Sequence, residues 1–264
     1  LCIIQQHSEM INFQFRFRRQ KPMCLILFSI SPDARYRLVV AANRDEFYAR
    51  PTERPAFWRD EPHILGGRDL QAGGTWLGVT RGGRFAAVTN FRESPLEPVP
   101  PRSRGALTAD FLRSTESCTD YLARIMPIAN EFRGFNLIIA DGQDVYYYSN
   151  RQPEAQLLKP GCYGLSNQLL DCDWPKVSRG REQLRALGHG NFDNEALFSL
   201  LADRGDQLAF SAGFIQSDTY GTSASTLVKV SQQADIYFEE RSFLPNGEPA
   251  GRRSFNLPIE AVAS

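Results

Sequence analysis

Four pairs of short apolar runs recur along the chain, and each pair encloses a few residues that favour turns. The pairs are 24–30 with 36–42, 75–80 with 84–91, 135–141 with 144–149, and 225–230 with 235–241. Short runs rich in β-branched and aromatic side chains, separated by Gly, Pro, Asp or Ser, are typical of β-hairpins. Successive hairpins favour sheets that are mainly antiparallel.

Helical periodicity falls between these strand pairs. Residues 107–126 place apolar side chains on one helical face, with an interruption near Ser114. Two further helices are predicted over 173–187, with Asp173 as the N-cap, and over 193–203. Strand pairs at both ends of the chain with helices between them predict an α+β layered sandwich.

The overall composition describes an ordinary globular protein and excludes several classes. Of 264 residues, 42% are hydrophobic and 23% are charged, with 30 basic and 30 acidic side chains. A net charge of zero argues against a nucleic-acid partner, which requires a basic surface. No apolar run approaches the ~20 residues that span a bilayer, so we do not expect an integral membrane protein.

The cysteines indicate a reducing environment. Their number is odd and they are widely spaced, at Cys2, Cys24, Cys118, Cys162 and Cys172. A chain of this size does not need disulfides to fold, so the sequence predicts a cytoplasmic location. With three histidines and no C-x-x-C motif, it predicts no structural zinc site.

The first 22 residues differ from the rest of the chain. Their positive charge comes at the end of the segment, whereas an export signal places it first and follows it with an apolar core. Two interpretations remain: residues 1–22 come from a wrongly assigned start, or they are a propeptide whose removal frees Cys24. In both cases the predicted domain covers residues 23–264.

The second strand of the first hairpin ends in a polar cluster, where "AANRDEF" contains Asn43, Arg44, Asp45 and Glu46. A returning hairpin brings this cluster near Cys24. Because a free thiol has a pKa near ~8.5, a guanidinium beside it favours the reactive thiolate. Arg44 is therefore a candidate to activate Cys24, with Asp45 orienting an amine or amide nearby. The alternative is a solvated turn whose ions pair with each other.

Several motifs, taken in order, resemble the NRDE family, to which the transport and Golgi organisation protein 2 relatives belong. They are "ANRDE", "GGTWLGVTRGGRFAAVTNFR", "RSRG", "GFNLIIADG", "YYYSN", "GCYGLSNQLLDCDWPKV" and "YGT". The resemblance covers Met23 to about Phe255. Members of the family begin with Met-Cys, which supports Met23 as the natural start.

The resemblance implies a four-layer αββα sandwich like that of the N-terminal nucleophile hydrolases, distantly related to choloylglycine hydrolases and penicillin V acylases. In those enzymes a terminal cysteine attacks an amide, and an Arg and an Asp support it. By resemblance these roles fall on Cys24, Arg44 and Asp45, although the order of the motif around the arginine differs. Asn90 matches the donor of the oxyanion hole, and Asn167 matches a second polar asparagine.

The implied function is an N-terminal cysteine amidohydrolase that acts on non-peptide C–N amide bonds of a small molecule and needs no cofactor. The α-amino group has a pKa of roughly 7.7–8.0, so a terminal cysteine carries its own general base. Further candidates for contact with the substrate are Asn43, Glu46, Trp76, Arg92, Arg102 and Arg104.

One position departs from the family pattern. The motif usually reads "YGT" followed by Arg, whereas Ser223 stands in the place of that arginine here. Unless Arg44 or Arg92 compensates, amide hydrolysis is expected to be weak or absent.

A carrier is therefore the alternative function, because the family is also linked to haem mobilisation and to acyl-CoA or lipid handling. In a carrier, Arg44, Arg102 and Arg104 would clamp phosphate or propionate groups. Haem would also need an axial ligand, which only His63, His189 and the thiols offer.

Overall fold

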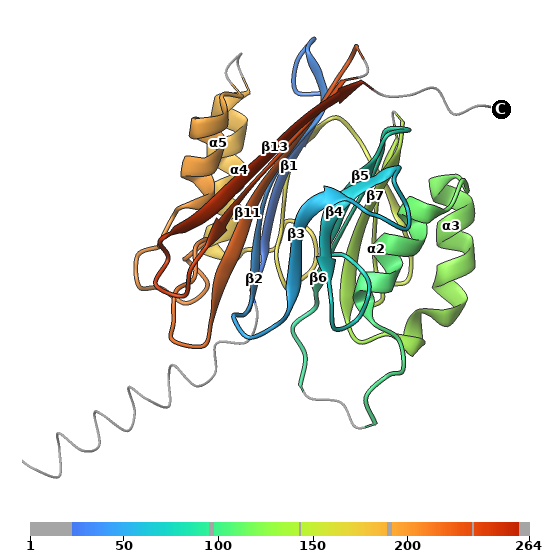
Figure 1. Cartoon of the computed structure of the whole chain (residues 1–264), viewed down its shortest axis with the longest axis horizontal. Helices are drawn as coiled ribbons and strands as arrows, with labels where there is room; N and C mark the ends of the chain where they lie inside the picture. The colour runs from blue at the N-terminus through green and yellow to red at the C-terminus, as the bar shows by residue number, and fades with distance from the viewer. Residues whose placement is uncertain (1–22, 95–97, 143, 189–191, 234, 259–264) are drawn as a thin grey trace, which may run out of the picture.

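Two β-sheets lie face to face, and helices cover the outer face of each sheet (Figure 1). The computed structural model describes residues 23–94, 98–142, 144–188, 192–233 and 235–258. Within these residues, the predicted α+β sandwich with four layers (helix, sheet, sheet, helix) is confirmed. The domain bounds, 1–22 and 23–264, stay a prediction because residues 1–22 lie outside the described residues.

The first sheet has six strands, and every neighbouring pair in it is antiparallel. In spatial order the strands are β10 (Gly161–Leu165), β1 (Leu25–Ile30), β2 (Tyr36–Phe47), β11 (Tyr220–Ser231), β12 (Asp235–Phe243) and β13 (Pro249–Pro258). The polar residues Asn43 to Glu46, which we call the NRDE cluster, lie within β2, and β2 has β1 and β11 as partners inside the sheet.

The second sheet has seven strands, also antiparallel throughout. It follows chain order: β3 (Thr52–Phe57), β4 (Ile64–Asp69), β5 (Leu77–Thr80), β6 (Arg84–Asn90), β7 (Phe135–Asp141), β8 (Val145–Ser149) and β9 (Gln156–Leu158). β6, which ends at the predicted oxyanion residue, is an inner strand.

Each sheet has its own helices. α2 (Arg104–Arg113) and α3 (Cys118–Ile125), followed by the 3₁₀ helix η1 (Met126–Glu131), pack on the second sheet. α4 (Pro175–Leu187) and α5 (Asn194–Leu201) pack on β1, β2, β10 and β11 of the first sheet (Figure 1). None of the described helices is long and apolar enough to cross a membrane.

The alternation of side chains along each strand assigns them to the layers. On β1, Ile26 and Phe28 enter the core between the two sheets, whereas Leu25 and Leu27 pack under α4 and α5. Successive side chains of a strand point to opposite faces, so one strand contributes to two cores. The same rule places Phe238 of β12 between the sheets, which fixes the orientation of the residues after it.

The four predicted hairpins are present, and the helical segment 107–126 is divided as expected, into α2 and α3. The prediction of Asp173 as an N-cap is wrong, because α4 begins at Pro175 and Trp174 occupies the N-cap position. Proline suits the first position of a helix because an N–H there would have no partner within the helix, so its absence costs no hydrogen bond. The sequence patterns did not predict strands β3, β4, β9, β10 and β13.

Candidate functional site

The Cys24 thiol lies at the open end of the β1–β2 pair. Leu25 pairs with Asn43, so continuing the antiparallel register brings Cys24 beside Arg44. The Cys24 Sγ atom lies 3.7 Å from the backbone oxygen of Asp45. Cys24, Arg44 and Trp76 line a cavity of about 20 Å³, enough for about one water molecule. The structure therefore brings the thiol and the NRDE cluster together.

Arg44 is held between the two sheets by an aromatic ring. Its guanidinium lies 4.2 Å from the centre of the Trp76 ring, and the side chain is 8% exposed. It donates to the Ser223 hydroxyl at 3.2 Å and lies 3.7 Å from the Glu46 carboxylate. Gly67 makes room for Trp76, because a Cβ atom there would lie 2.2 Å from the ring. The stacking on Trp76 and the ion pair with Glu46 together keep the positive charge near the thiol.

The thiol is nevertheless neutral while Met23 is attached. Burial, and then the Asp45 carboxylate, raise the pKa of Cys24 to about 11, although Arg44 and Lys176 lower it. The predicted activation by Arg44 is thus outweighed in this state of the chain. Since the thiolate is the nucleophile, the thiol needs a further base to react.

The Asp45 carboxyl group is buried with one oxygen unsatisfied. Its Oδ1 atom accepts a hydrogen bond from the Thr222 hydroxyl at 2.6 Å, whereas Oδ2 has no partner among the described residues. Burial raises the pKa of Asp45 to about 7, although Lys176, Thr222 and Arg44 lower it. A buried carboxylate oxygen without a donor is costly, so each such atom calls for an explanation.

Lys176, which the sequence patterns did not single out, holds the Met23–Cys24 segment. Its Nζ atom donates to the Met23 carbonyl at 2.6 Å and to the Cys24 carbonyl at 3.4 Å. The side chain comes from the first turn of α4 and is 1% exposed. Burial lowers its pKa, although Asp45 and Cys24 raise it. On the other side, the Met23 N–H donates to the Tyr220 hydroxyl at 3.0 Å.

The ends of β10 and β6 meet at the same place. The Ser166 hydroxyl donates to the Cys24 carbonyl at 2.7 Å, and the Asn167 side-chain amide donates to the Asn90 carbonyl at 2.7 Å. Asn167 is fully buried. Asn90 is partly exposed, and its side-chain amide makes no hydrogen bond with any described residue. Asn90 therefore has donors free for a ligand.

Of the other residues predicted to contact the substrate, some lie at the Cys24 site and others do not. Asn43 is among the residues that line the Cys24 cavity, but its side-chain amide donates to the Leu201 and Gly213 carbonyls on the α5 side. Arg102 pairs with Glu131 at 2.6 Å on the surface, and the structure does not bring it to the site.

Arg104 lies within electrostatic reach of the thiol, and Arg92 contacts the segment that carries Asn167. The Arg104 guanidinium donates to the Gly134 carbonyl at 3.3 Å. Burial, and then the charge of Arg133, lower its pKa to about 10, whereas Glu93 raises it. The backbone N–H of Arg92 donates to the Asn167 carbonyl, and its guanidinium lies 4.8 Å from the centre of the Phe210 ring. Arg92 is thus attached to the Asn167 loop.

Ser223 occupies a β-bulge of β11, where the register against β2 shifts between Thr222 and Ala224. Its hydroxyl donates to the Arg44 carbonyl at 3.1 Å and accepts from the Arg44 guanidinium. The short side chain therefore fixes Arg44 from both ends.

A larger hollow, which we call the outer cleft, lies beyond Arg44. Its volume is about 450 Å³, and its lining includes Arg44, Tyr48, Arg54, Trp76, Ser223 and Glu240. This volume is in the range of small-molecule sites. Arg44 and Trp76 line both the outer cleft and the Cys24 cavity, so the two spaces adjoin.

The described residues around these two spaces offer few ligands for a metal ion or for haem iron. Among the described residues no group of three or more His, Cys, Asp or Glu side chains could hold a metal ion. No His, Cys or Met is among the described residues that line the outer cleft. His63 lies in an exposed turn before β4, and His189 lies outside the described residues. Of the side chains that can ligate haem iron, the described lining of the cleft therefore offers only the Tyr48 phenol.

Comparisons with known proteins agree with the motifs. The family model described as Transport and Golgi organisation 2 matches residues 23–245. The Transport and Golgi organization 2 homolog of Mus musculus is 36% identical over 84% of this chain and 94% of its own length. The Homo sapiens homolog is 33% identical with the same coverage. A solved structure, a Caenorhabditis elegans N-acylethanolamine-hydrolyzing acid amidase ortholog, has 13% sequence identity and a TM-score of 0.48, covering 77% of this chain and 91% of that chain.

Proposed function

The chain belongs to the Transport and Golgi organisation 2 family, and from its site we propose that Cys24 is an N-terminal nucleophile that hydrolyses a small-molecule amide. The observation that carries the proposal is the unsatisfied Oδ2 atom of the buried Asp45 carboxylate. The β1–β2 register begins with Leu25 opposite Asn43, and extending it by two residues would place Met23 opposite Asp45. An amino group that begins at Cys24 would supply the donor that this oxygen lacks.

The free amino group would also act as the base. It takes the proton from Sγ, and the thiolate attacks the amide carbon of the substrate to form a C–S bond. The C–N bond then breaks, and the amino group passes its proton to the departing amine. Water hydrolyses the remaining thioester. The nearby charge of Lys176 favours the unprotonated amine and the thiolate, because both carry less positive charge than their protonated forms.

The negative charge that develops on the substrate oxygen needs donors. The unused side-chain amide of Asn90 is the first candidate, and Asn167 holds the Asn90 backbone in place. A donor of this kind contributes ~3–4 kcal/mol in enzymes from which it has been removed. Arg44, stacked on Trp76, adds a positive charge on the same side of β2 as the thiol.

The proposal is tested by comparing two proteins, one beginning at Met23 and one beginning at Cys24, on a set of N-acyl amides with a fluorogenic amine. We expect turnover only from the protein that begins at Cys24, together with stoichiometric labelling of Cys24 by iodoacetamide. Cys162→Ala is the matched control and should change neither result. Equal turnover by the protein that begins at Met23 would exclude the terminal-amine mechanism.

A carrier of an organic anion, such as an acyl-CoA or another lipid, is the second candidate. It is favoured by the outer cleft, where Arg44 and Arg54 face a volume of about 450 Å³. Ligand binding without turnover by the protein that begins at Cys24 would favour it over the enzyme. Haem is the weaker ligand candidate because the described lining of the cleft holds no His, Cys or Met, which leaves Tyr48 as its only possible axial ligand. A cytoplasmic location stays a prediction for either function.

A further inference from the structure

Glu240 is a buried carboxyl group that the proposed reaction does not use. It lies on β12 two residues after Phe238 and therefore faces the space between the sheets. It is 4% exposed and lines the outer cleft. Its Oε2 atom accepts a hydrogen bond from the Thr226 hydroxyl at 3.2 Å, and within the described residues it forms no ion pair.

Three arginines surround Glu240 without pairing with it. Arg44 from β2, Arg54 from β3 and Arg253 from β13 all favour its charged form. Arg54 instead donates to the Ala250 carbonyl at 2.9 Å, and Arg253 donates to the Pro55 carbonyl at 3.2 Å. Neither of these two guanidiniums has a carboxylate partner among the described residues. The cleft therefore has more cationic than anionic groups.

Burial nevertheless dominates the titration of Glu240. It raises the pKa to about 7, although Thr226 and the three arginines lower it. Near neutral pH the group is thus divided between a carboxylate and a neutral acid. As the neutral acid it is a hydrogen-bond donor directed at a space lined by Arg44 and Arg54.

We propose that the outer cleft binds the carboxylate of an organic acid, which receives hydrogen bonds from Arg44, Arg54 and the neutral carboxyl group of Glu240. Two guanidiniums and one neutral acid suit an anion, whereas they would repel an ammonium group. The side chains of Phe47, Tyr48 and Phe243 line the same cleft and would contact an apolar body.

For the proposed hydrolysis, the substrate is then an amide that also carries a carboxylate. Because Arg44 and Trp76 line both spaces, the carboxylate end would lie in the outer cleft and the amide end would extend toward Cys24. This identification of the substrate rests on the proposed function, whereas binding of the carboxylate does not.

The test measures octanoate binding by calorimetry to the full chain at pH 6 and pH 8. Octanoate is ionised at both values, so a change in affinity reports on the protein. If only the neutral acid is competent, a pKa near 7 makes binding about tenfold weaker at pH 8 than at pH 6. Octylammonium should not bind at either pH.

Two variants and two controls assign the pH dependence of octanoate binding to Glu240 and the binding itself to the cleft. Glu240→Gln keeps a neutral donor, so it should bind octanoate equally at both pH values. Arg54→Gln changes an exposed side chain and should weaken binding at pH 6 at least tenfold. Arg124→Gln is the matched control. Arg124 lies on α3 and pairs with Glu116, so this variant should not change octanoate binding. The pKa of Asp45 is also about 7. Asp45→Asn should leave the pH dependence of octanoate binding unchanged, which would show that the dependence comes from Glu240.

Equal affinity at pH 6 and pH 8, a pH dependence that survives Glu240→Gln, or octylammonium binding as tight as octanoate binding would each overturn the proposal. The same measurements are made in Cys24→Ala. Because that variant has no nucleophile, octanoate binding there is independent of hydrolysis. Failure of the amide assay therefore leaves this result intact, and failure here leaves the amide assay intact.

Discussion

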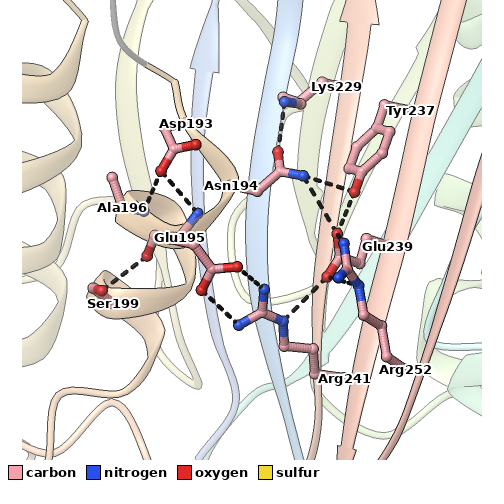
Figure 2. A network of polar contacts seen from close by, with 10 residues as sticks. All are labelled: Asp193, Asn194, Glu195, Ala196, Ser199, Lys229, Tyr237, Glu239, Arg241 and Arg252. Carbon is pink, nitrogen blue, oxygen red and sulfur yellow. Dashed lines mark hydrogen bonds and ion pairs between the residues drawn. The ribbon is translucent and has the colours of Figure 1, made fainter.

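Two adjacent glutamates of β12 are buried on opposite faces of the first sheet, and their surroundings differ. Glu239 is 0% exposed and Glu240 is 4% exposed. Glu239 lies on the face that α5 approaches, within the network drawn in Figure 2. Its carboxylate accepts hydrogen bonds from Asn194, Tyr237, Arg241 and Arg252. Glu240, between the sheets, accepts one from Thr226.

The difference separates a structural carboxylate from a functional candidate. Burial raises the pKa of Glu239, but hydrogen bonds from Tyr237, Arg252 and Arg241 outweigh it and hold the pKa below its usual value. For Glu240, burial prevails and the pKa rises to about 7. Burial alone therefore does not mark a functional group. A functional candidate is instead a buried ionisable group that has few hydrogen-bond partners and faces a cavity.

The largest expected effect comes from breaking the satisfied network. Glu239→Gln leaves Arg241 and Arg252 without their shared anion, and one amide N–H₂ then faces donors. Arg241 keeps Glu195 as a partner and Arg252 is 58% exposed, so neither arginine is left as an uncompensated buried charge. We therefore expect the free energy of unfolding to fall by about 3 kcal/mol, the upper end for hydrogen bonds to a charged group. Urea denaturation at pH 7 measures the loss. Glu195→Gln is the control, because that side chain of the same network is 70% exposed and should cost less than about 1 kcal/mol. A Glu239 variant as stable as the control would contradict this account.

The arrangement of the strands was predictable where turn chemistry is local. In the first hairpin, the Asp33 carboxylate accepts from the backbone N–H groups of Arg35 and Tyr36, as the turn residues suggest. β3 and β4 were missed because Pro55 and the Gly66–Gly67 pair resemble strand breakers. Gly67 is required there by Trp76, which is a long-range reason that local patterns do not contain.

From residue patterns alone, the site was predictable only where residues close in the chain form it, whereas Asn90 and Asn167 were assigned by the family resemblance. Cys24 and Arg44 meet because one hairpin joins them. Lys176 reaches the Met23 and Cys24 carbonyls across more than 150 residues of chain, and a lysine in the first turn of a helix is usually solvated. The pair Glu239–Glu240 looks uniform in sequence, and alternation assigns the two side chains to opposite faces. Only packing decides which of them finds partners.

A smaller effect is expected in the pH dependence of stability, to which Glu240 contributes. The pKa of Glu240 rises on folding, from a usual value of 4.5 to about 7. The folded state therefore binds the proton more tightly, and this contribution to stability is complete below pH 4.5 and is lost as the pH rises through 7. Relative to Glu240→Gln, the wild-type protein should lose about 2–3 kcal/mol of unfolding free energy between pH 4.5 and pH 8. Denaturation at several pH values measures the difference, in which the contribution of Asp45 cancels. A constant difference would mean that Glu240 is ionised throughout.

The smallest expected effect comes from removing one hydrogen bond to Glu240 or one hydrogen bond to Glu239. Thr226→Val removes the hydroxyl that lowers the pKa of Glu240, so the pKa should rise above 7 and the pH midpoint of octanoate binding should rise with it. Tyr237→Phe removes one of the four residues that donate to Glu239, which keeps Asn194 and the two arginines. Each variant should cost about 1 kcal/mol or less in unfolding free energy, the usual contribution of one hydrogen bond. Only the Thr226 variant should move the binding midpoint, because only Glu240 titrates near neutral pH among the two glutamates. A midpoint shift of equal size in the Tyr237 variant would show that the two faces of β12 are coupled, and that the satisfied network contributes to the ligand site.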